Sequence, residues 1–330
     1  MFGTNGPIGY ADEALSQGPK VIVGRKGAYR GVHLASGPFW VIDTAYYLSL
    51  APEIDPRWAY YALLNSDINN LGSGSAIPST TREDFYALPV LVPGEDEQKA
   101  VADVLSTIDD KIAANARVVR AADELSRACF QVAAVDGHET PLSSLARFVN
   151  GRAYTKDATG TGRVVVRIAE LNSGIGASTV RNDIEVPDDN TARPGDLLFA
   201  WSGSLTAARW YRPEAIVNQH IFKVIPNDGM PMWLVNQAVH AKLDEFKAIA
   251  ADKATTMGHI QRRHLDEPVR VPSEGDVKRL DELMNGLWAA ALAAEIESLK
   301  LALTRDELLP LLMSGKVRVK DSEKLAEAVL

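Results

Sequence analysis

The stretch TREDFYALPVLVPGEDEQKAVADVLSTIDDKI, residues 81–112, has a counterpart in QRRHLDEPVRVPSEGDVKRLDELMNGLWAAAL, residues 261–292. Both stretches run through a short apolar segment bounded by prolines, PVLVP at 89–93 and PVRVP at 268–272, into a sequence with helical periodicity. Two such stretches so far apart indicate that a large unit is repeated within the chain, and the unit is too long for a solenoid repeat.

Further matches extend this repeat on the N-terminal side of each stretch. Residues 21–28 lie over 197–204 at an offset of 176, residues 41–48 and 55–64 lie over 216–223 and 230–239 at an offset of 175, and 89–93 lie over 268–272 at an offset of 179. The third pair superposes Trp58 on Trp233, and we expect both tryptophans to anchor a core. The repeat predicts two homologous domains that face two similar targets.

A long helix is predicted to follow each apolar segment. From Glu95 onward, apolar or small residues recur at alternating spacings of four and three, as in a heptad seam: Val101, Leu105, Ile108, Ile112, Asn115, Val119, Ala122, Ser126, Cys129 and Ala133. About 38 residues without Pro or Gly could extend about 57 Å as one helix. The second seam comprises Leu280, Met284, Leu287, Leu292, Ile296, Leu299 and Leu303, up to Pro310.

Two long helices with apolar seams are expected to pack on each other, with Asn115 as a candidate for setting their register, because an unpaired buried amide is costly. The alternative is that each seam packs only on its own globular part. The short runs rich in β-branched and aromatic residues that precede each helix predict strands, ending in a proline-bounded strand at LPVLVP or EPVRVP.

We therefore predict an α+β fold, with two mixed α/β domains separated by two long antiparallel helices that form a coiled-coil-like spacer, and a pseudo-twofold internal repeat. The expected parts are a first domain at 1–94, a first long helix at 95–135, a second domain at 136–273, a second long helix at 274–315 and a C-terminal tail at 316–330. Residues 140–175 have no counterpart ahead of Met1. We thus expect the first domain to be shorter, either lacking a strand and exposing a sheet edge or simply smaller.

The composition sets limits on the class of protein. The 330 residues are 46% hydrophobic and 24% charged, which is ordinary for a globular chain and too long for one compact core to be the default. The single cysteine, Cys129, excludes an internal disulfide and favours a cytoplasmic location. No apolar run approaches the roughly 18 residues of a spanning helix, so no membrane partner is expected. A net charge of -8 argues mildly against nucleic acid, but basic patches remain at 14–42 and 246–264.

Catalytic and metal-binding motifs are not found in the sequence. It contains no phosphate-binding loop, no His-Glu-x-x-His, no Cys-x-x-Cys and no Gly-x-Ser-x-Gly, and its six histidines do not fall at metal-ligand spacing. The run EFK at 245–247 after PDD at 187–189 resembles the end of a nuclease triad, but a pattern so short is expected by chance. We predict that the chain is not an enzyme and binds no metal.

Several motifs together resemble the DNA-specificity subunits of type I restriction-modification enzymes. They are FGTNGPIGY at 2–10, VGRKGAYRG at 23–31, GSGSAIPSTTREDF at 72–85, the stretch at 81–112 and LLPLLMSGKVRV at 308–319. The likeness covers nearly the whole length. In the first copy, EDEQKAVADVL matches the family's sequence pattern, whereas the equivalent SEGDVKRLDEL in the second copy departs from it.

This resemblance implies a function and a set of partners. Such a subunit reads a bipartite site in double-stranded DNA, with one recognition domain for each half-site and the helix pair as the ruler between them. It is not catalytic. It binds two copies of a modification subunit, which uses S-adenosylmethionine to methylate adenine, and a restriction subunit that translocates DNA and cleaves it. The helices are the expected docking surface for these partners, and no cofactor is expected in this chain.

The candidate DNA-binding residues combine side chains that read bases with side chains that hold phosphates. In the first domain they are Arg25, Lys26, Tyr29, Arg30, Ser73, Ser75, Thr80, Thr81 and Arg82. In the second domain they are Trp201, Ser202, Gln219, His220, Lys253, Thr255, Thr256, His259, Gln261 and Arg262. The structural alternative for each is a solvated turn residue.

Two other functions stay open on the sequence alone. One is a coiled-coil scaffold whose globular ends bind proteins, which would show negligible affinity for DNA. The other is a nuclease that depends on Glu245 and Lys247, which would lose cleavage when either residue is replaced.

Overall fold

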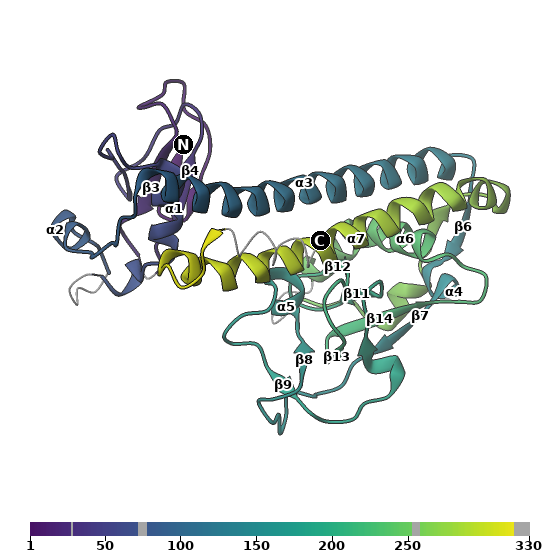
Figure 1. Cartoon of the computed structure of the whole chain (residues 1–330). Coiled ribbons are helices and arrows are strands. Elements are labelled where there is room, and N and C mark those ends of the chain that lie inside the picture. Colours follow the sequence, from purple (N-terminus) through teal and green to yellow (C-terminus); the bar gives the residue numbers. More distant parts are fainter. Residues whose placement is uncertain (28, 72–77, 253–257, 320–330) are drawn as a thin grey trace. The chain divides into compact units, whose positions relative to one another are not determined.

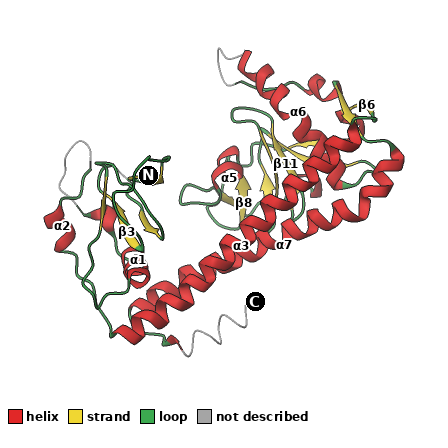
Figure 2. Cartoon of the chain, turned by 90° about the horizontal axis from the view of Figure 1, so that it is seen from above, coloured by secondary structure: helices red, strands yellow, loops and turns green. Residues whose placement is uncertain are grey.

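The computed structural model describes residues 1–27, 29–71, 78–252 and 258–319 (Figures 1 and 2). The chain divides into two compact units. Unit 1 comprises Met1–Ala113 and Lys300–Leu330, and unit 2 comprises Ala114–Leu299. The two long helices, α3 (Glu95–Ala134) and α7 (Glu274–Met313), each contribute residues to both units. No described helix is both long enough and apolar enough to span a membrane.

Unit 1 is built on a small antiparallel sheet in the order β4-β3-β5. Its described elements are β1 (Phe2–Gly3), β2 (Gly6–Pro7), β3 (Lys20–Gly24), β4 (Val32–Ala35), β5 (Ala45–Tyr47), α1 (Pro56–Leu64), the 3-10 helix η1 (Ile68–Asn70) and α2 (Arg82–Tyr86). The central strand β3 is almost wholly buried, and α1 packs against β3 and β4. In Figure 2 this sheet lies beside α1.

Helix α1 begins where the sequence provides both a cap and a proline. The Asp55 side chain accepts hydrogen bonds from the backbone of Arg57 and Trp58, and Pro56 occupies the first turn, where no N–H is needed. The helix buries Trp58, which is 3% exposed and belongs to the core of unit 1. The predicted role of this tryptophan as a core anchor is confirmed.

Unit 2 contains two four-stranded sheets, in the orders β12-β11-β14-β7 and β10-β13-β8-β9. The strands are β7 (Ala146–Asn150), β8 (Arg163–Val166), β9 (Arg181–Asn182), β10 (Thr191–Ala192), β11 (Leu197–Ala200), β12 (Thr206–Arg209), β13 (Ala215–Val217) and β14 (Ile221–Pro226). A further pair joins β6 (His138–Pro141) to β15 (Pro268–Val271). The helical elements are α4 (Leu142–Leu145), α5 (Ile168–Ser173), η2 (Asp188–Asn190), α6 (Met232–Asp252) and η3 (Arg262–Asp266).

The main hydrophobic cluster of unit 2 is larger than that of unit 1. Strand β11 is fully buried, and α6 packs on β12, α4 and β15. Trp233 at the start of α6 is 1% exposed, and its Nε1 donates to Asp281 at 2.9 Å. Burying a tryptophan while its polar nitrogen finds a partner is the usual way such a residue anchors a core, and this prediction is also confirmed.

The strand register of unit 1 recurs in unit 2. Residues 22, 23 and 24 of β3 pair with 47, 46 and 45 of β5, and residues 198, 199 and 200 of β11 pair with 223, 222 and 221 of β14. Each residue number in the second set exceeds its counterpart by 176. On the other side of β14 lies β7, whereas β5 is an edge strand of its sheet in the described part of unit 1.

The predicted long helices are confirmed at Glu95–Ala134 and Glu274–Met313. Every predicted seam position of α3 is buried or half-buried. In unit 2 the buried Asn115 amide donates to Glu297 of α7 at 2.7 Å, while Phe130 shares a core with Leu280 and Met284. Residues later in α3 therefore lie opposite residues earlier in α7, and the two helices are antiparallel there.

One detail of the second helix differs from expectation. Leu303, predicted in the seam, is 56% exposed, and the core of unit 1 is contacted by Leu301, Leu308 and Leu312 instead. The helix continues past Pro310 to Met313, as the predicted bounds of 274–315 require. A strict heptad drifts around a straight helix, so a seam extrapolated over six turns points away from its partner.

The strand predicted at LPVLVP is wrong. Residues 88–93 have no regular structure, whereas the equivalent Pro268–Val271 is β15. The difference lies in the partner, because β15 pairs with β6, and no strand pairs with 88–93 among the residues that the structure describes. An apolar run needs a neighbouring strand to become part of a sheet.

Candidate nucleic-acid interface

In unit 1, the predicted residues on either side of the undescribed segment 72–77 are brought together. The loop after β3 pairs with residues 78–80 through the bridge between Lys26 and Ser79. Gly27 N–H donates to Pro78 O at 2.8 Å, and Thr80 N–H donates to Arg25 O at 2.9 Å. We call residues 25–27 with 78–80 the first loop junction. Gly27 has a φ of 107°, a backbone conformation that glycine adopts without strain.

Unit 2 repeats these contacts. Ser202 bridges to His259, Gly203 N–H donates to Gly258 O at 2.8 Å, and Ile260 N–H donates to Trp201 O at 3.1 Å. We call residues 201–203 with 258–260 the second loop junction. Its residue numbers exceed those of the first by 176 in the strand-end loop and by 180 in the other segment.

Arg25 and Arg82 in unit 1 share one aromatic partner. The guanidinium carbons of Arg25 and Arg82 lie 4.9 and 5.6 Å from the ring centroid of Tyr46 on β5. Stacking on a ring fixes the direction of a guanidinium while leaving its N–H groups available for another ligand. The predicted cations therefore gather on a ring that the sequence-based prediction missed.

Other predicted residues of unit 1 have structural partners. The Arg30 side chain is 2% exposed and donates to Asn69 O, to Leu71 O at 2.9 Å and to Thr80 Oγ1 at 2.5 Å. Thr80 is itself buried. Such geometry is typical of residues that hold loops together, so we leave Arg30 and Thr80 out of the interface.

The remaining predicted residues of unit 1 are exposed or fall outside the described residues. Lys26 Nζ pairs with Asp43 at 2.6 Å, Thr81 caps α2 through Asp84, and Tyr29 is 72% exposed. Ser73 and Ser75 lie outside the described residues.

Trp201 forms the centre of the second loop junction. Its indole Nε1 donates to Asn150 Oδ1 at 2.8 Å, and its ring lies 5.1 Å from His220, 5.7 Å from Phe222 and 6.3 Å from His259. Ser202 is 3% exposed, and its Oγ has no hydrogen-bond partner among the described residues. Buried hydroxyls are normally satisfied, so this group is open to an additional partner.

The other predicted residues of unit 2 surround this cluster. Gln219 and Gln261 are exposed, and Arg262 is exposed while donating to Phe148 O at 2.8 Å. His220 has a φ of 72°, which is uncommon for a residue other than glycine. Lys253, Thr255 and Thr256 lie outside the described residues.

Sequence reasoning missed residues that complete both junctions, above all Tyr46, Asp43, Asn150 and Arg152. The repeat could have found Tyr46, because at an offset of 176 it superposes on Phe222, which stacks on Trp201 as Tyr46 stacks on Arg25. Asn150 and Arg152 lie in the segment without a counterpart in unit 1, so the repeat gave no signal for them.

The residues of the suggested nuclease pattern do not form a site. Lys242 Nζ pairs with Glu245 at 2.5 Å, and this hydrogen bond holds the pKa of the Glu245 carboxyl below its usual value. Asp188 pairs with Arg193 at 2.6 Å, and Lys247 lies 3.5 Å from Asp244. Among the described residues, no group of three or more His, Cys, Asp or Glu side chains could hold a metal ion. The resemblance to a nuclease triad is therefore a coincidence of sequence.

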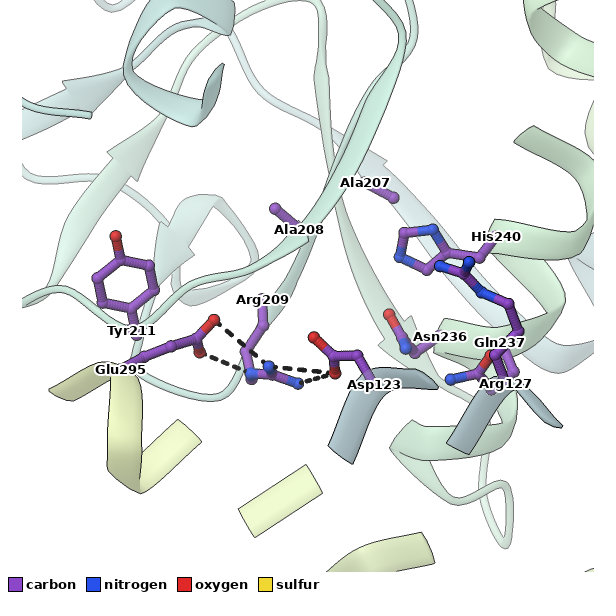
Figure 3. A pocket seen from close by; sticks show the side chains of 10 residues that line it. All are labelled: Asp123, Arg127, Ala207, Ala208, Arg209, Tyr211, Asn236, Gln237, His240 and Glu295. Atoms are coloured by element: carbon purple, nitrogen blue, oxygen red, sulfur yellow. Dashed lines mark hydrogen bonds and ion pairs between the residues drawn. The ribbon is translucent and has the colours of Figure 1, made fainter. Parts of the chain in front are cut away.

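A polar cavity of about 220 Å³ lies elsewhere in unit 2, lined from α3, β12, α6 and α7 (Figure 3). Arg209 is the buried centre of its ionic contacts, pairing with Glu295 at 2.7 Å and with Asp123 at 3.4 Å, and its guanidinium stacks on Trp288 at 4.5 Å. Burial raises the pKa of Glu295 above its ordinary value, against the opposing effect of Arg209. We interpret this ion-pair cluster as an anchor that joins β12 to both long helices.

Comparison with known proteins finds a family whose model matches the part of the chain that contains the first loop junction. The model of the type I restriction modification DNA specificity domain matches residues 2–119. The EcoprrI type I restriction enzyme specificity subunit of Escherichia coli is 32% identical over 109 residues, which is 33% of this chain and only 27% of that relative.

Solved structures resemble the chain over most of its length. The S subunit of a type I restriction-modification system from M. genitalium aligns over 94% of this chain and 87% of its own at 19% identity, with a TM-score of 0.63. The HsdS subunit of Thermoanaerobacter tengcongensis aligns over 93% of this chain and 84% of its own at 14% identity, with a TM-score of 0.35. The first likeness shows the fold. The specificity-domain match shows that residues 2–119 are similar to type I restriction-modification specificity subunits, and this chain spans only 27% of the length of the matched curated relative.

Proposed function

We propose that this chain is the sequence-specific DNA-recognition subunit of a type I restriction-modification system. One recognition domain at 1–94 and another at 136–273 would each read one half of a bipartite site in double-stranded DNA. The observation that carries this proposal is the recurrence of the loop junction, an antiparallel bridge formed by the same two backbone hydrogen bonds in both units. A duplicated recognition surface is what a target with two half-sites requires.

The chemistry of the two junctions supports DNA as the ligand. Guanidinium groups that stack on Tyr46 keep N–H donors available for phosphate or guanine, and exposed Gln219 and Gln261 offer amides of the kind that read adenine. Around the second junction, Arg152, Arg262 and Arg263 are exposed. These local cations provide the phosphate affinity that the net charge of -8 would otherwise oppose.

Partner subunits would supply the chemical steps. We propose that two copies of the modification subunit and a restriction subunit dock on the long helices, and that adenine methylation with S-adenosylmethionine takes place in the modification subunit. This assignment fits a chain whose candidate nuclease residues pair with neighbours. We also propose a cytoplasmic location, where host DNA and these partners meet.

One face of α3 supports the docking proposal. A second apolar seam follows spacings of four and three residues and comprises Ala114, Val118, Ala121, Leu125, Ala128 and Val132 on α3, with Val135 directly after the helix. Each of the first six residues immediately precedes a residue of the buried seam, so this seam is turned by about 100° around the helix axis. Its larger side chains are 46–75% exposed. We call this surface the outer seam, and it has the spacing that a partner helix packs against.

Methylation sequencing tests the proposed function directly. The chain and its modification subunit are expressed together in a host that lacks other adenine methyltransferases, and the methylated sites are mapped. We expect methylated adenine in a bipartite motif that disappears when this chain is omitted. Purified complex should bind duplex DNA with an affinity that falls steeply as salt increases. A modification subunit that methylates the same sites without this chain would refute the proposal, and absent DNA affinity would favour the scaffold.

A further inference from the structure

The turn between β13 and β14 in unit 2, residues 218–220, is fixed by its backbone. Gln219 N–H donates to Arg152 O at 2.8 Å, His220 O accepts from Trp201 N–H at 3.1 Å, and Ile221 N–H donates to Asn218 O at 3.3 Å. The first two hydrogen bonds tie the turn to Arg152 and to the second loop junction, and the third closes the turn itself. A group presented by such a turn needs little ordering when it binds a ligand.

The side chains on either side of Gln219 are directed into the protein. Asn218 is 5% exposed, and its Oδ1 accepts from Tyr154 N–H at 3.1 Å. The His220 ring packs against Trp201 in a tilted arrangement, and its Nδ1 is buried without a partner among the described residues. Gln219 between them is exposed. The turn therefore presents one polar side chain outward.

One residue of this turn has a backbone conformation that is uncommon outside glycine. His220 has a φ of 72°, a left-handed conformation that glycine would adopt at no steric cost. Retaining a histidine there costs stability unless the position serves another purpose, and strained positions of this kind cluster at binding sites. The ring of His220 packs on Trp201 and thereby places residue 219 at the tip.

We infer that Gln219 reads one adenine in the half-site bound by the second recognition domain. This inference rests on the proposed function and adds the base and the residue. A glutamine amide can donate to N7 and accept from the exocyclic amino group of adenine in the major groove, a pairing that no other base matches as well. The backbone carbonyl of Arg152 accepts a hydrogen bond from the backbone N–H of Gln219. The exposed Arg152 side chain is suited to a phosphate next to that adenine.

Unit 1 presents a different side chain from the same turn. Ala45 N–H donates to Ile42 O at 3.1 Å and Arg25 N–H donates to Thr44 O at 2.9 Å, which repeats two contacts of the 218–220 turn at an offset of 176. The residue equivalent to Gln219 is Asp43, whose side chain is 74% exposed and pairs with Lys26. A carboxylate accepts hydrogen bonds but donates none, so it suits the amino group of cytosine rather than the edge of adenine.

The test compares methylation motifs of the complete complex with Gln219→Ala, with Asp43→Ala and with Asn172→Ala as a control for loss of an exposed amide elsewhere in unit 2. We expect Gln219→Ala to make one adenine position of one half-site degenerate, with discrimination reduced by about tenfold to a hundredfold. Asp43→Ala should relax a position in the other half-site only. Asn172→Ala should leave the motif unchanged, and thermal unfolding verifies that each variant folds.

The outcomes separate this inference from the function on which it rests. Suppose that the unaltered chain gives a bipartite motif and that Gln219→Ala gives the same motif. This result overturns the role of Gln219 and leaves the proposed function standing. Uniform loss of methylation at every site in a folded Gln219→Ala variant also overturns it, because a base reader affects one position. Absence of any motif that depends on the unaltered chain overturns both.

Discussion

At the scale of the single residue, His240 on α6 shows how burial controls a charge. The imidazole borders the polar cavity, where burial lowers its pKa below 6.5, Arg127 lowers it further and Asp123 opposes the shift (Figure 3). In the unfolded chain the group takes up a proton near its ordinary pKa of 6.5. The unfolded state thus binds more protons just below that pH, and the stability that His240 contributes falls as the pH decreases.

This linkage predicts the behaviour of His240→Gln, which cannot be protonated. The free energy of unfolding of the unaltered protein should decrease between pH 7.5 and pH 5, and the variant should show a shallower decrease, measured by denaturant unfolding at each pH. Some slope should remain because burial also lowers the pKa of His33, and His33→Gln should remove a separate part of it. If the free energy of unfolding of His240→Gln depends on pH as steeply as that of the unaltered protein, the imidazole is solvated in the folded state.

The identity of the site residues could be predicted from residue type only in part. Arg25, Arg82 and Gln219 are charged or amide side chains in Gly-rich or turn segments, and they lie at the two junctions or their turns. Arg30 has the same residue type and neighbours, yet it is buried and holds residues 69–71 in place. Sequence composition cannot separate these cases, because the separation depends on which backbone carbonyls a distant loop brings near.

At the scale of the element, the attachment of strand β12 to the long helices depends on Arg209. Its guanidinium pairs with Glu295 of α7 and Asp123 of α3 and stacks on Trp288. Arg209→Met keeps the length of the side chain but leaves the half-buried Glu295 carboxylate without its partner. We expect the free energy of unfolding to decrease by about 3 kcal/mol, measured by urea unfolding at pH 7.

A surface ion pair provides the matched control for Arg209. Arg279 pairs with Asp276 at 2.7 Å within α7, and the two side chains are 65% and 32% exposed. Arg279→Met should change the stability by less than about 1 kcal/mol. A double variant with Glu295→Gln should recover part of the loss in Arg209→Met, since the uncompensated charge is then absent. Equal effects of the two arginine replacements would refute the anchor.

The elements themselves differ in how far sequence could predict them. Helices α3 and α7 follow from local periodicity, and their predicted ends agree with the structure within two residues. The failed strand at 88–93 has nearly the same sequence as β15, so nothing local distinguishes them. A strand depends on a partner that can be distant in sequence, whereas a helix bonds within itself.

At the scale of the whole molecule, duplication explains features that each unit alone leaves unexplained. The sheet register and the tight turn recur at an offset of 176, the two segments of the loop junction recur at offsets of 176 and 180, and the exposed residue at the turn changes from Asp43 to Gln219. Under the proposed function, a shared scaffold with different exposed residues at its turns would let one chain read two unlike half-sites. Sequence predicted the duplication, but the equivalence of Asp43 and Gln219 required the paired strands, because sequence alignment alone gave an offset of 175 there.

Assembly with the modification subunit should depend on the outer seam. Leu125, at the middle of this seam, is 47% exposed, and docking of a partner helix would bury it. Leu125→Asp replaces that burial with a carboxylate that must lose water. We expect the affinity for the modification subunit to fall by about thirtyfold, or about 2 kcal/mol, measured by titration calorimetry. The stability of the isolated chain should change by less than about 0.5 kcal/mol, because the side chain is exposed there.

Ile184→Asp is the matched control, since Ile184 belongs to the same unit, is 46% exposed and lies outside α3. It adds the same charge and removes a similar apolar side chain, so it should leave the affinity unchanged. If both variants bind the modification subunit as the unaltered chain does, the outer seam is not the docking face. If both weaken binding equally, the effect comes from charge in general. A loss confined to Leu125→Asp, with methylation reduced but the bipartite motif retained, assigns assembly to the helix and specificity to the loop junctions.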